Sequence, residues 1–226
     1  MKMVYTKSFK SEEFQIKLIP NYHTKTNESI TKIIGEMRDL MIKSWGEGGK
    51  LIEEWVYSAD VIGLAYKNGE LRSFSIVNYE EKNTLYLRAT VVHPYDSRKG
   101  LCKFMNCICI KYILEKKHYC IWKFWRWLDV IYFVFCTANP LLYAIVSKNE
   151  NVYPSMDKRQ KISLKDEEVL LNIVKKFAPR AKYDIETSVL KEDLKSYPSL
   201  IYEEKSISWS DDKKVNDFFE TTLRLK

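Results

Sequence analysis

The spacing of apolar and polar residues predicts alternating strands and helices in the first part of the chain. Residues 13–18 alternate weakly and predict a first strand. In residues 30–44, apolar side chains recur at the spacing of one helix face, which indicates an amphipathic helix. Residues 51–57 fit either a short helix or an irregular segment. The pattern therefore predicts a strand followed by one long helix.

The strongest strand signal lies further along the chain. Residues 60–66 and 70–79 are rich in β-branched and aromatic residues, and Asn68-Gly69 between them favours a type I′ turn. A third run of this kind covers residues 84–92. Three runs joined by short connections predict an antiparallel meander.

Helix and strand signals alternate again after the meander. A long amphipathic pattern begins after Gly100, and an apolar run at residues 132–138 predicts a strand. Pro140 suits the first turn of a further helix over residues 141–148. The predicted fold class is α/β (α+β), with a mixed, mostly antiparallel sheet flanked by helices on both faces.

The character of the chain changes after residue 154. Ser163 stands three residues before Asp166 and ahead of an apolar stripe, a capping-box-like start for a helix. A last helix is predicted near residues 211–223. We therefore divide the chain into a first domain, residues 1–154, and a C-terminal extension, residues 155–226, which is not expected to fold independently.

A short basic loop joins the last strand of the meander to the next helix. His93-Pro94 ends the strand, and Arg98, Lys99 and Gly100 precede the helix. Free backbone N–H groups at the start of a helix attract anions, as does the helix dipole, and adjacent cationic side chains strengthen that attraction. The loop therefore predicts a site for a phosphate-bearing ligand; the alternative is an ordinary turn with surface charges.

The distribution of charge points to the same segment. The chain has 37 Lys and Arg against 30 Asp and Glu, a formal net charge of +7. Residues 98–126 hold eight basic residues and the single acid Glu115, which also sums to +7, so the rest of the chain is balanced. The positive charge is local, as expected for one anionic ligand or surface.

These elements and the basic loop resemble the GNAT superfamily of N-acetyltransferases. That family has a strand ending in Val-x-Pro, followed by a loop of the form Arg/Gln-x-x-Gly-x-Gly/Ala. Here Val92-His93-Pro94 matches the strand end, and Ser97-Arg98-Lys99-Gly100-Leu101-Cys102 occupies the loop. Ser97 and Cys102 depart from the family's preferred residues. The resemblance covers roughly residues 13–150.

The resemblance implies an acyl-CoA site between the last meander strand and the strand at 132–138. The backbone of the meander strand would pair with the pantetheine arm, and loop N–H groups would hold the pyrophosphate. Asn139 occupies the place of an Asn that contacts the cofactor in that family. The implied cofactor-binding residues are Thr90, Val91, Val92, Arg98, Lys99, Gly100, Leu101, Cys102, Lys103 and Asn139.

The residues that the resemblance implies for catalysis match less well. The family's thiolate-protonating Tyr corresponds to Val146; Tyr143, one helical turn earlier, would serve as general acid or pack in the core. The family's strand Glu corresponds to Arg88, and a cation cannot act as a general base. Glu80 and Glu81, at the end of a strand, are candidate bases, with ordinary loop charges as the alternative.

Composition narrows the location and the cofactors. Five cysteines, an odd number, and an N-terminus without an apolar leader predict reduced thiols in a cytoplasmic protein. The spacing Cys107-x-Cys109, without a second pair, does not predict a metal site. The apolar stretch Val130–Val146 is short and interrupted by Asn139-Pro140, so no transmembrane segment is expected.

An aromatic and basic segment lies outside this scheme. Residues 122–127 read Trp-Lys-Phe-Trp-Arg-Trp. Such a segment can stack on nucleic-acid bases or lie at a lipid interface. The alternatives are packing against the sheet and contact with a second subunit, so a homodimer stays open.

The sequence therefore predicts an acyl-CoA-dependent N-acyltransferase. The expected partners are acetyl-CoA as donor and an amine, small molecule or protein, as acceptor; nucleic acid is not expected. The extension from residue 155 is expected to pack on the acceptor side. Two other classes stay open: a catalytically inactive interaction module of the same fold, and a binder of membrane surfaces or nucleic acid that uses the basic residues 98–126.

Overall fold

A six-stranded sheet organises the first of the two units into which the chain divides. The structure is a computed structural model, and the two units are Met1–Phe135 and Cys136–Lys226. Each unit is described by itself. The described residues are 3–9, 12–20, 28–46, 52–80, 84–118, 132–135, 162–177, 182–184, 189–191 and 211–218.

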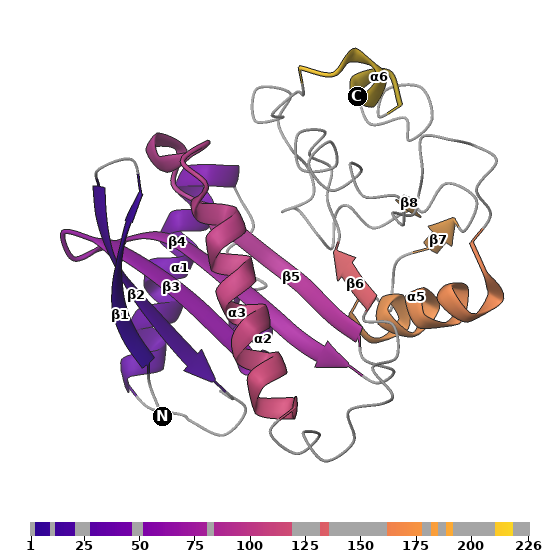
Figure 1. The fold of residues 1–226 in the computed structure, drawn as a ribbon, viewed down its shortest axis with the longest axis horizontal. Coiled ribbons are helices and arrows are strands. Elements are labelled where there is room, and N and C mark those ends of the chain that lie inside the picture. The colour runs from indigo at the N-terminus through magenta and orange to yellow at the C-terminus, as the bar shows by residue number, and fades with distance from the viewer. Residues whose placement is uncertain are drawn as a thin grey trace. The chain divides into compact units, whose positions relative to one another are not determined.

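The strands follow one another across the sheet in the order of the sequence (Figure 1). The first five are antiparallel to their neighbours, and the sixth is parallel to the fifth. The predicted mixed, mostly antiparallel sheet is confirmed. The strands are β1 (Met3–Phe9), β2 (Glu12–Pro20), β3 (Val61–Lys67), β4 (Glu70–Glu80), β5 (Thr84–Val92) and β6 (Tyr132–Phe135).

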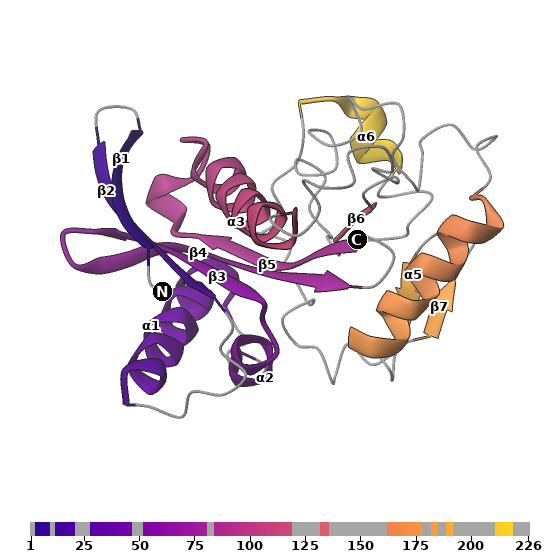
Figure 2. The same cartoon turned by 60° about the horizontal axis from the view of Figure 1, so that its bottom comes forward.

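Helices cover both faces of this sheet, as predicted. α1 (Glu28–Trp45) and α2 (Ile52–Tyr57) lie on one face, and α3 (Leu101–His118) lies on the other (Figure 2). The core under α1 and α2 includes Met37 and Phe74, both fully buried. Two smaller apolar clusters lie under α3. Burial on both faces explains why β3 reads as a continuous apolar run rather than an alternating one.

The start of the chain differs from the expectation. The strand expected at residues 13–18 is β2, but β1 precedes it and pairs with it from Met3↔Leu18 to Phe9↔Glu12. β1 gave no sequence signal of its own because its place in the sheet depends on pairing with β2. The segment at 51–57, left open between helix and irregular structure, contains the helix α2.

The turn between β3 and β4 agrees with its sequence. Asn68 has φ 52° and Gly69 has φ 80°, so both residues occupy the left-handed region that a type I′ turn requires. Asn tolerates this region better than most residues and Gly adopts it freely. The turn therefore fixes the register of the hairpin locally.

α3 approaches the sheet closely at Gly63 in β3. A Cβ atom at Gly63 would lie 2.7 Å from Cys109 Sγ and 2.9 Å from Met105 Cε. Cys109 is fully buried, and burial raises the pKa of its thiol to about 12. Both residues belong to the face of α3 that packs on the sheet.

The second unit is described in four short pieces. α5 (Leu164–Phe177) is the helix expected after residue 163, and Ser163 Oγ accepts the Asp166 N–H (3.2 Å) as a cap. β7 (Lys182–Asp184) and β8 (Val189–Lys191) form a small antiparallel sheet. α6 (Lys213–Asp217) lies within the range expected for the last helix.

Candidate functional site

A β-bulge in β5 lies at the centre of the candidate site. The β4–β5 register runs from Ser73↔Val92 to Ile76↔Ala89 and resumes at Val77↔Leu87, so Arg88 is the extra residue. A bulge bends the strand and re-aims the side chain of the extra residue. Ala89 belongs to the core under α1 and α2, and Arg88 bonds to α2, so both side chains face the same side of the sheet.

The pairing of β5 with β6 ends beside this bulge. The parallel register runs from Thr84↔Tyr132 to Leu87↔Phe135 and, in the described strands, goes no further. β5 itself continues to Val92 along β4. Within the described part of the sheet, β5 therefore has an open edge from Arg88 to Val92, on the side away from β4.

The ladder decides which backbone groups of β5 face the open edge. His93 N–H donates to the Arg72 carbonyl (2.8 Å), so Arg72 and His93 form a hydrogen-bonded pair. Such pairs alternate along an antiparallel ladder. The backbone groups of Val91 therefore point toward β4, whereas those of Thr90 and Val92 point to the open edge.

The side chains along this part of β5 also have defined places. Val91 is fully buried in the core under α1 and α2. Thr90 lies on the α3 face, where Thr90 Oγ1 and Ser75 Oγ each donate to Asn106 Oδ1 at 2.6 Å. The Val92 side chain packs against an apolar cluster under α3, and the Val92 carbonyl, which has two lone pairs, accepts one bond from Ser44 Oγ (3.2 Å). Backbone rather than side-chain groups of Thr90 and Val92 would thus meet a ligand at the edge.

The loop after β5 is held by a buried carboxylate. Pro94–Asp96 form a 3-10 turn, and Asp96, 1% exposed, accepts bonds from Arg72 Nε (2.6 Å) and Lys99 Nζ (2.9 Å). Burial alone would raise the pKa of Asp96, but the bonds from Lys99 and Arg72 hold it below its ordinary value. The carboxylate therefore stays ionised and fixes the loop on β4.

Lys99 and Arg98, both implied phosphate ligands, stand in different surroundings. Lys99 Nζ also contacts Glu12 Oε2 on β2 (2.5 Å), and its bonds to Glu12 and Asp96 raise the pKa of the ammonium. Lys99 thus joins the loop to β2. Arg98 is exposed and adopts φ 61°, an unusual conformation for a residue with a long side chain. Of the two cations, Arg98 is the one that a ligand can reach without displacing a carboxylate.

The start of α3 offers free backbone donors. The first bond within the helix runs from Phe104 N–H to the Gly100 carbonyl (3.1 Å). The N–H groups of Gly100 to Lys103 precede it and have no partner inside the helix. Gly100 has φ 86°, and a Cβ there would meet nothing within 4 Å. The helix N-terminus therefore opens onto free space, as an anion site requires.

Leu101, Cys102 and Lys103 complete this helix start. Leu101 is buried and Lys103 is exposed. Burial, together with the nearby Cys107, raises the pKa of the Cys102 thiol to about 11. The thiol therefore stays protonated near neutral pH and adds no negative charge beside the helix N-terminus.

A polar cluster surrounds the bulge on the α2 side. The Arg88 guanidinium donates to Glu54 Oε1 (3.0 Å) and to Ser58 Oγ, and it lies over the Trp55 ring, 5.8 Å from the centroid. Asn78 Nδ2 donates to the Ser58 carbonyl (2.5 Å). Asn78 Oδ1 is buried and has no hydrogen-bond partner in the described part of the chain. Of this cluster, the sequence analysis named Arg88 alone. It missed Glu54 and Asn78 because only the packing of α2 on the sheet brings them to Arg88.

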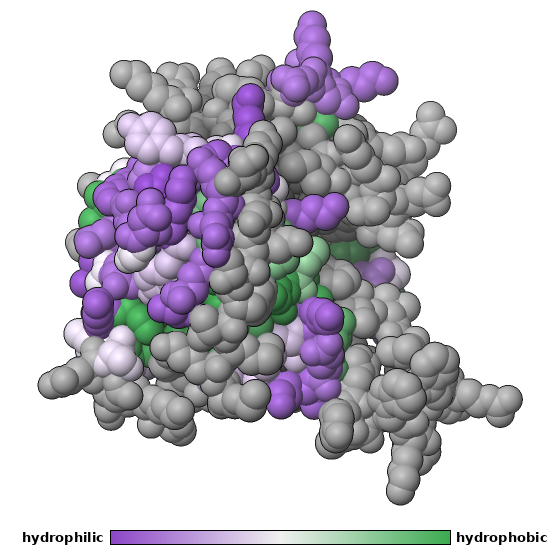
Figure 3. All heavy atoms as spheres, turned by 60° about the vertical axis from the view of Figure 1, so that its left-hand side comes forward, coloured by the Kyte–Doolittle hydropathy of each residue, from purple (hydrophilic) through white to green (hydrophobic). Residues whose placement is uncertain are grey.

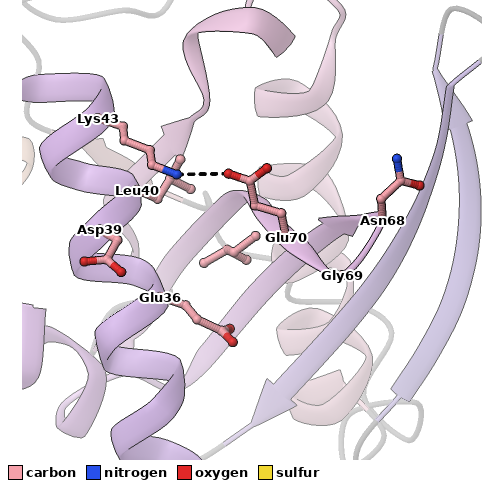
Figure 4. A pocket seen from close by; sticks show the side chains of 8 residues that line it. Glu36, Asp39, Leu40, Lys43, Asn68, Gly69 and Glu70 are labelled. Carbon is pink, nitrogen blue, oxygen red and sulfur yellow. Dashed lines mark hydrogen bonds and ion pairs between the residues drawn. The ribbon is translucent and has the colours of Figure 1, made fainter.

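A separate hollow lies between α1 and the β3–β4 turn (Figure 4). It measures about 430 Å³ and carries three carboxylates. Glu36 Oε2 accepts from Tyr66 OH (2.6 Å), and Glu70 Oε1 accepts from Lys43 (2.9 Å). An acidic lining repels phosphates, so this hollow does not fit the anionic ligand that the basic loop predicts. Its residues are Glu36, Asp39, Leu40, Lys43, Asn68, Gly69, Glu70 and Leu71.

Several predicted site residues lie outside the part of the chain that the structure describes. Asn139, Tyr143, Glu81 and the segment 122–127 lie outside the described residues. Glu80 is the last residue of β4, half-buried, and pairs with Thr84. The structure thus places the residues from Thr90 to Lys103, which the resemblance implies for the cofactor, on one strand, loop and helix start, and both the cofactor-binding and the catalytic roles stay predictions.

The surface, the helices and the arrangement of possible metal ligands add three observations. On the face in Figure 3, hydrophilic residues gather over much of the coloured area, with smaller hydrophobic areas between them. Among the described helices, none has the length and apolar content needed to cross a membrane. No group of three His, Cys, Asp or Glu side chains suited to a metal ion occurs in the described ranges.

Comparison with known proteins gives similarities of structure alone. No family model matches the chain, and no curated protein matches it. A probable acetyltransferase from Staphylococcus aureus is 11% identical and covers 66% of this chain and 98% of its own, with TM-score 0.43. A GNAT-family acetyltransferase from Listeria monocytogenes is 15% identical, and the match covers 50% of this chain and 77% of the Listeria chain, with TM-score 0.37.

A third similar structure is a ribosomal-protein-alanine N-acetyltransferase from Brucella melitensis. It is 13% identical and covers 66% of this chain and 98% of its own, with TM-score 0.38. At these identities and TM-scores the likeness assigns no activity to this chain. The resemblance to the GNAT superfamily therefore rests on the motif from Val92 to Cys102 and on the order of the elements around it.

Proposed function

We propose that the first unit binds an acyl-CoA along the open edge of β5 and transfers the acyl group to an amine. The observation that carries this proposal is a juxtaposition on one strand. The bulge at Arg88 and the end of the β5–β6 pairing at Leu87 lie at one end of the open edge. The loop with Arg98 and the free N–H groups from Gly100 onward follow the other end.

This arrangement suits the three chemical parts of an acyl-CoA. The amides of the pantetheine arm can add to the edge of β5 through the backbone of Thr90 and Val92, as an extra strand does. The pyrophosphate suits the N–H groups of residues 100–103, with Arg98 beside them. With the phosphates at the loop, the arm runs back along β5 and brings the thioester to the bulge at Arg88.

The reaction that follows is direct acyl transfer. A neutral amine attacks the thioester carbonyl, the C–N bond forms, the C–S bond breaks, and the CoA thiolate takes up a proton. Backbone N–H groups at the bulge would stabilise the developing oxyanion. Tyr143 as the acid, Asn139 as a cofactor contact, and residues 155–226 on the acceptor side stay part of this proposal, as does the cytoplasmic location.

One observation favours a second candidate, an acyl-CoA binder without catalysis. The side chain at the bulge is a cation, Arg88, with 4% of its surface exposed, where the resembled family carries a carboxylate. Binding without turnover of any amine would support this candidate, whereas binding with turnover would exclude it.

Calorimetric titration with acetyl-CoA tests the proposal. We expect one saturable site whose affinity persists between about 0.1 M and about 1 M salt, because backbone hydrogen bonds carry much of the binding and exposed charge pairs are screened over this range. Affinity that collapses with salt would instead indicate a basic surface that binds polyanions. A folded protein that binds no acetyl-CoA would contradict the proposal.

A further inference from the structure

The polar cluster at the bulge contains a carboxylate that the sequence did not single out. We propose, on the basis of the function proposed above, that Glu54 takes the proton from the acceptor amine and that Arg88 positions it. In this arrangement the base, Glu54, lies on α2 and is bound by Arg88 of β5.

Burial of Arg88 is the first step of this inference. Its side chain is 4% exposed, and a buried guanidinium is costly unless a carboxylate and further acceptors compensate it. Glu54 supplies the carboxylate at 3.0 Å, and Ser58 Oγ supplies a second acceptor. Because the bulge aims Arg88 at α2, the Glu54 carboxylate is held directly beside the bulge.

The exposure of Glu54 is the second step. Its side chain is 68% exposed, so one side of the carboxylate meets Arg88 and the rest meets solvent. A base in this place can receive a proton from an incoming ammonium ion and pass it to water.

An unused acceptor is the third, independent observation. Asn78 is 3% exposed, and its Oδ1 atom has no hydrogen-bond partner among the described residues. Buried polar atoms are rarely left without a partner, so an unpaired one calls for an explanation, of which a group supplied by a bound molecule is one. Asn78 and Arg88 both bond to Ser58, from neighbouring strands on one face. An N–H of the bound amine would satisfy Asn78 Oδ1, which Ser58 and Arg88 link to Glu54.

The topology places the two substrates on opposite sides of β5. α3, whose N-terminus suits the phosphates, covers one face of the sheet, and α2, which carries Glu54, covers the other (Figure 2). The thioester at the bulge is then reached by the amine from the α2 side. Glu54 takes one proton from the ammonium ion, and the neutral amine attacks; Glu54 later releases the proton to water.

A pair of adjacent glutamates provides the test. Glu54→Gln keeps the shape of the side chain and removes its basicity, and the Gln amide oxygen can still accept the bond from Arg88; the melting temperature of the variant reports any folding defect. We expect kcat to fall by about 100-fold or more, while affinity for acetyl-CoA stays unchanged. Glu53→Gln is the matched control: Glu53 pairs with Arg38 (2.8 Å), not with the bulge, and its removal should leave kcat near that of the wild type.

The assay measures CoA release from acetyl-CoA by mass spectrometry, with a panel of primary amines and with water alone as acceptor. Equal loss of kcat in both variants, or no loss in Glu54→Gln, overturns the proposal. The proposal is also overturned if the protein binds acetyl-CoA but releases no CoA, either with the amines or with water alone. A working base would at least activate water. Absence of acetyl-CoA binding contradicts the proposed function itself, so the two failures are distinguishable.

Arg88 variants separate positioning from a merely structural role. Arg88→Met should lower kcat strongly without changing the KM for acetyl-CoA, and Arg88→Lys should restore part of kcat. The acidic limb of the pH profile of kcat should be present in the wild type and in Glu53→Gln and absent in Glu54→Gln. A common loss of kcat, cofactor affinity and melting temperature in both Arg88 variants would show that Arg88 only maintains the fold and would overturn its positioning role.

Discussion

Two turns of this protein solve a similar backbone problem with different residues. In the β3–β4 turn, Asn68 and Gly69 have φ 52° and 80°; in the loop before α3, Arg98 and Gly100 have φ 61° and 86°. Each turn thus combines a glycine with a second residue in the left-handed region. Asn is among the residues that tolerate this region best, whereas Arg is not.

Under the proposed function, the difference separates a turn that serves the fold from a loop that binds a ligand. A left-handed conformation costs a residue such as Arg about 1–2 kcal/mol, and the surrounding structure must compensate it. Around Arg98 that compensation comes from Asp96, which binds Arg72 and Lys99 and holds the loop. We interpret Arg98, an exposed cation held in a strained backbone beside a helix N-terminus, as a residue placed for an anion, in line with the proposed function.

The largest expected effect comes from Gly100→Glu. A carboxylate at this position would stand at the start of α3, repel the pyrophosphate and fill the space in which we expect it to bind. We expect affinity for acetyl-CoA to fall by at least about 1,000-fold, or about 4 kcal/mol, measured by calorimetry.

Gly46→Glu is the control for Gly100→Glu. Gly46 also has a left-handed φ, 82°, and a Cβ there also meets nothing within 4 Å, but the residue follows α1. Both variants should lose about 1–2 kcal/mol of stability, but only Gly100→Glu should lose affinity for acetyl-CoA. Similar affinities in the two variants would remove the loop from the site.

Asp96→Asn tests what holds the loop. Loss of one partner of a buried ion pair costs about 3–5 kcal/mol; since Asn keeps a hydrogen-bond acceptor, we expect a loss of about 2 kcal/mol, measured by denaturant unfolding. The pKa of Asp96 is lowered in the folded protein, so its stabilisation is present above about pH 4 and disappears as the pH falls through that lowered pKa. The difference between wild type and variant should therefore shrink in acid; a constant difference would show that the charge of Asp96 does not contribute.

Arg98→Gly should move stability and affinity in opposite directions. Glycine relieves the left-handed strain, so stability should rise by about 1 kcal/mol, while loss of the cation should weaken acetyl-CoA binding by about 10-fold. Asn68→Gly, in the other turn, should change neither quantity by much. If Arg98→Gly binds acetyl-CoA as tightly as the wild type, the comparison between the two turns loses its functional meaning.

Cys102→Ala should have the smallest effect. Alanine is one of the residues that the resembled family carries at this position, and it lets the helix start approach a phosphate more closely than a protonated thiol does. We expect acetyl-CoA to bind about threefold more tightly, or about 0.6 kcal/mol. Weaker binding would show that the thiol, which accepts a long contact from Asn106 Nδ2 (3.9 Å), helps to hold the helix start.

The sequence predicted what depends on local pattern. The Asn68-Gly69 turn, the strand at 84–92 and the helix after Gly100 each follow from neighbouring residues, and the structure contains all three. β1 was missed because only its pairing with β2 defines it. The sequence could show that Arg88 is a cation, but not that a bulge turns it toward Glu54, because a bulge is a property of two paired strands.

The contacts of the loop were likewise beyond the sequence. Lys99 was assigned to a phosphate because it stands next to Arg98, yet in the structure it binds Glu12, 87 positions away in the chain. Nor could periodicity distinguish Val91, whose backbone groups face β4, from Thr90 and Val92. Such distinctions require the register of the sheet, which long-range pairing determines.

Amide hydrogen exchange with and without acetyl-CoA tests the central claim most directly. We expect new protection at the N–H groups of Thr90 and Val92 and of residues 100–103, with little change at Val91, whose N–H faces β4. Protection confined to the exposed basic residues of α3, such as Lys111 and Lys116, or no protection in a protein that binds acetyl-CoA, would contradict the claim that the open edge of β5 and the start of α3 form the cofactor site.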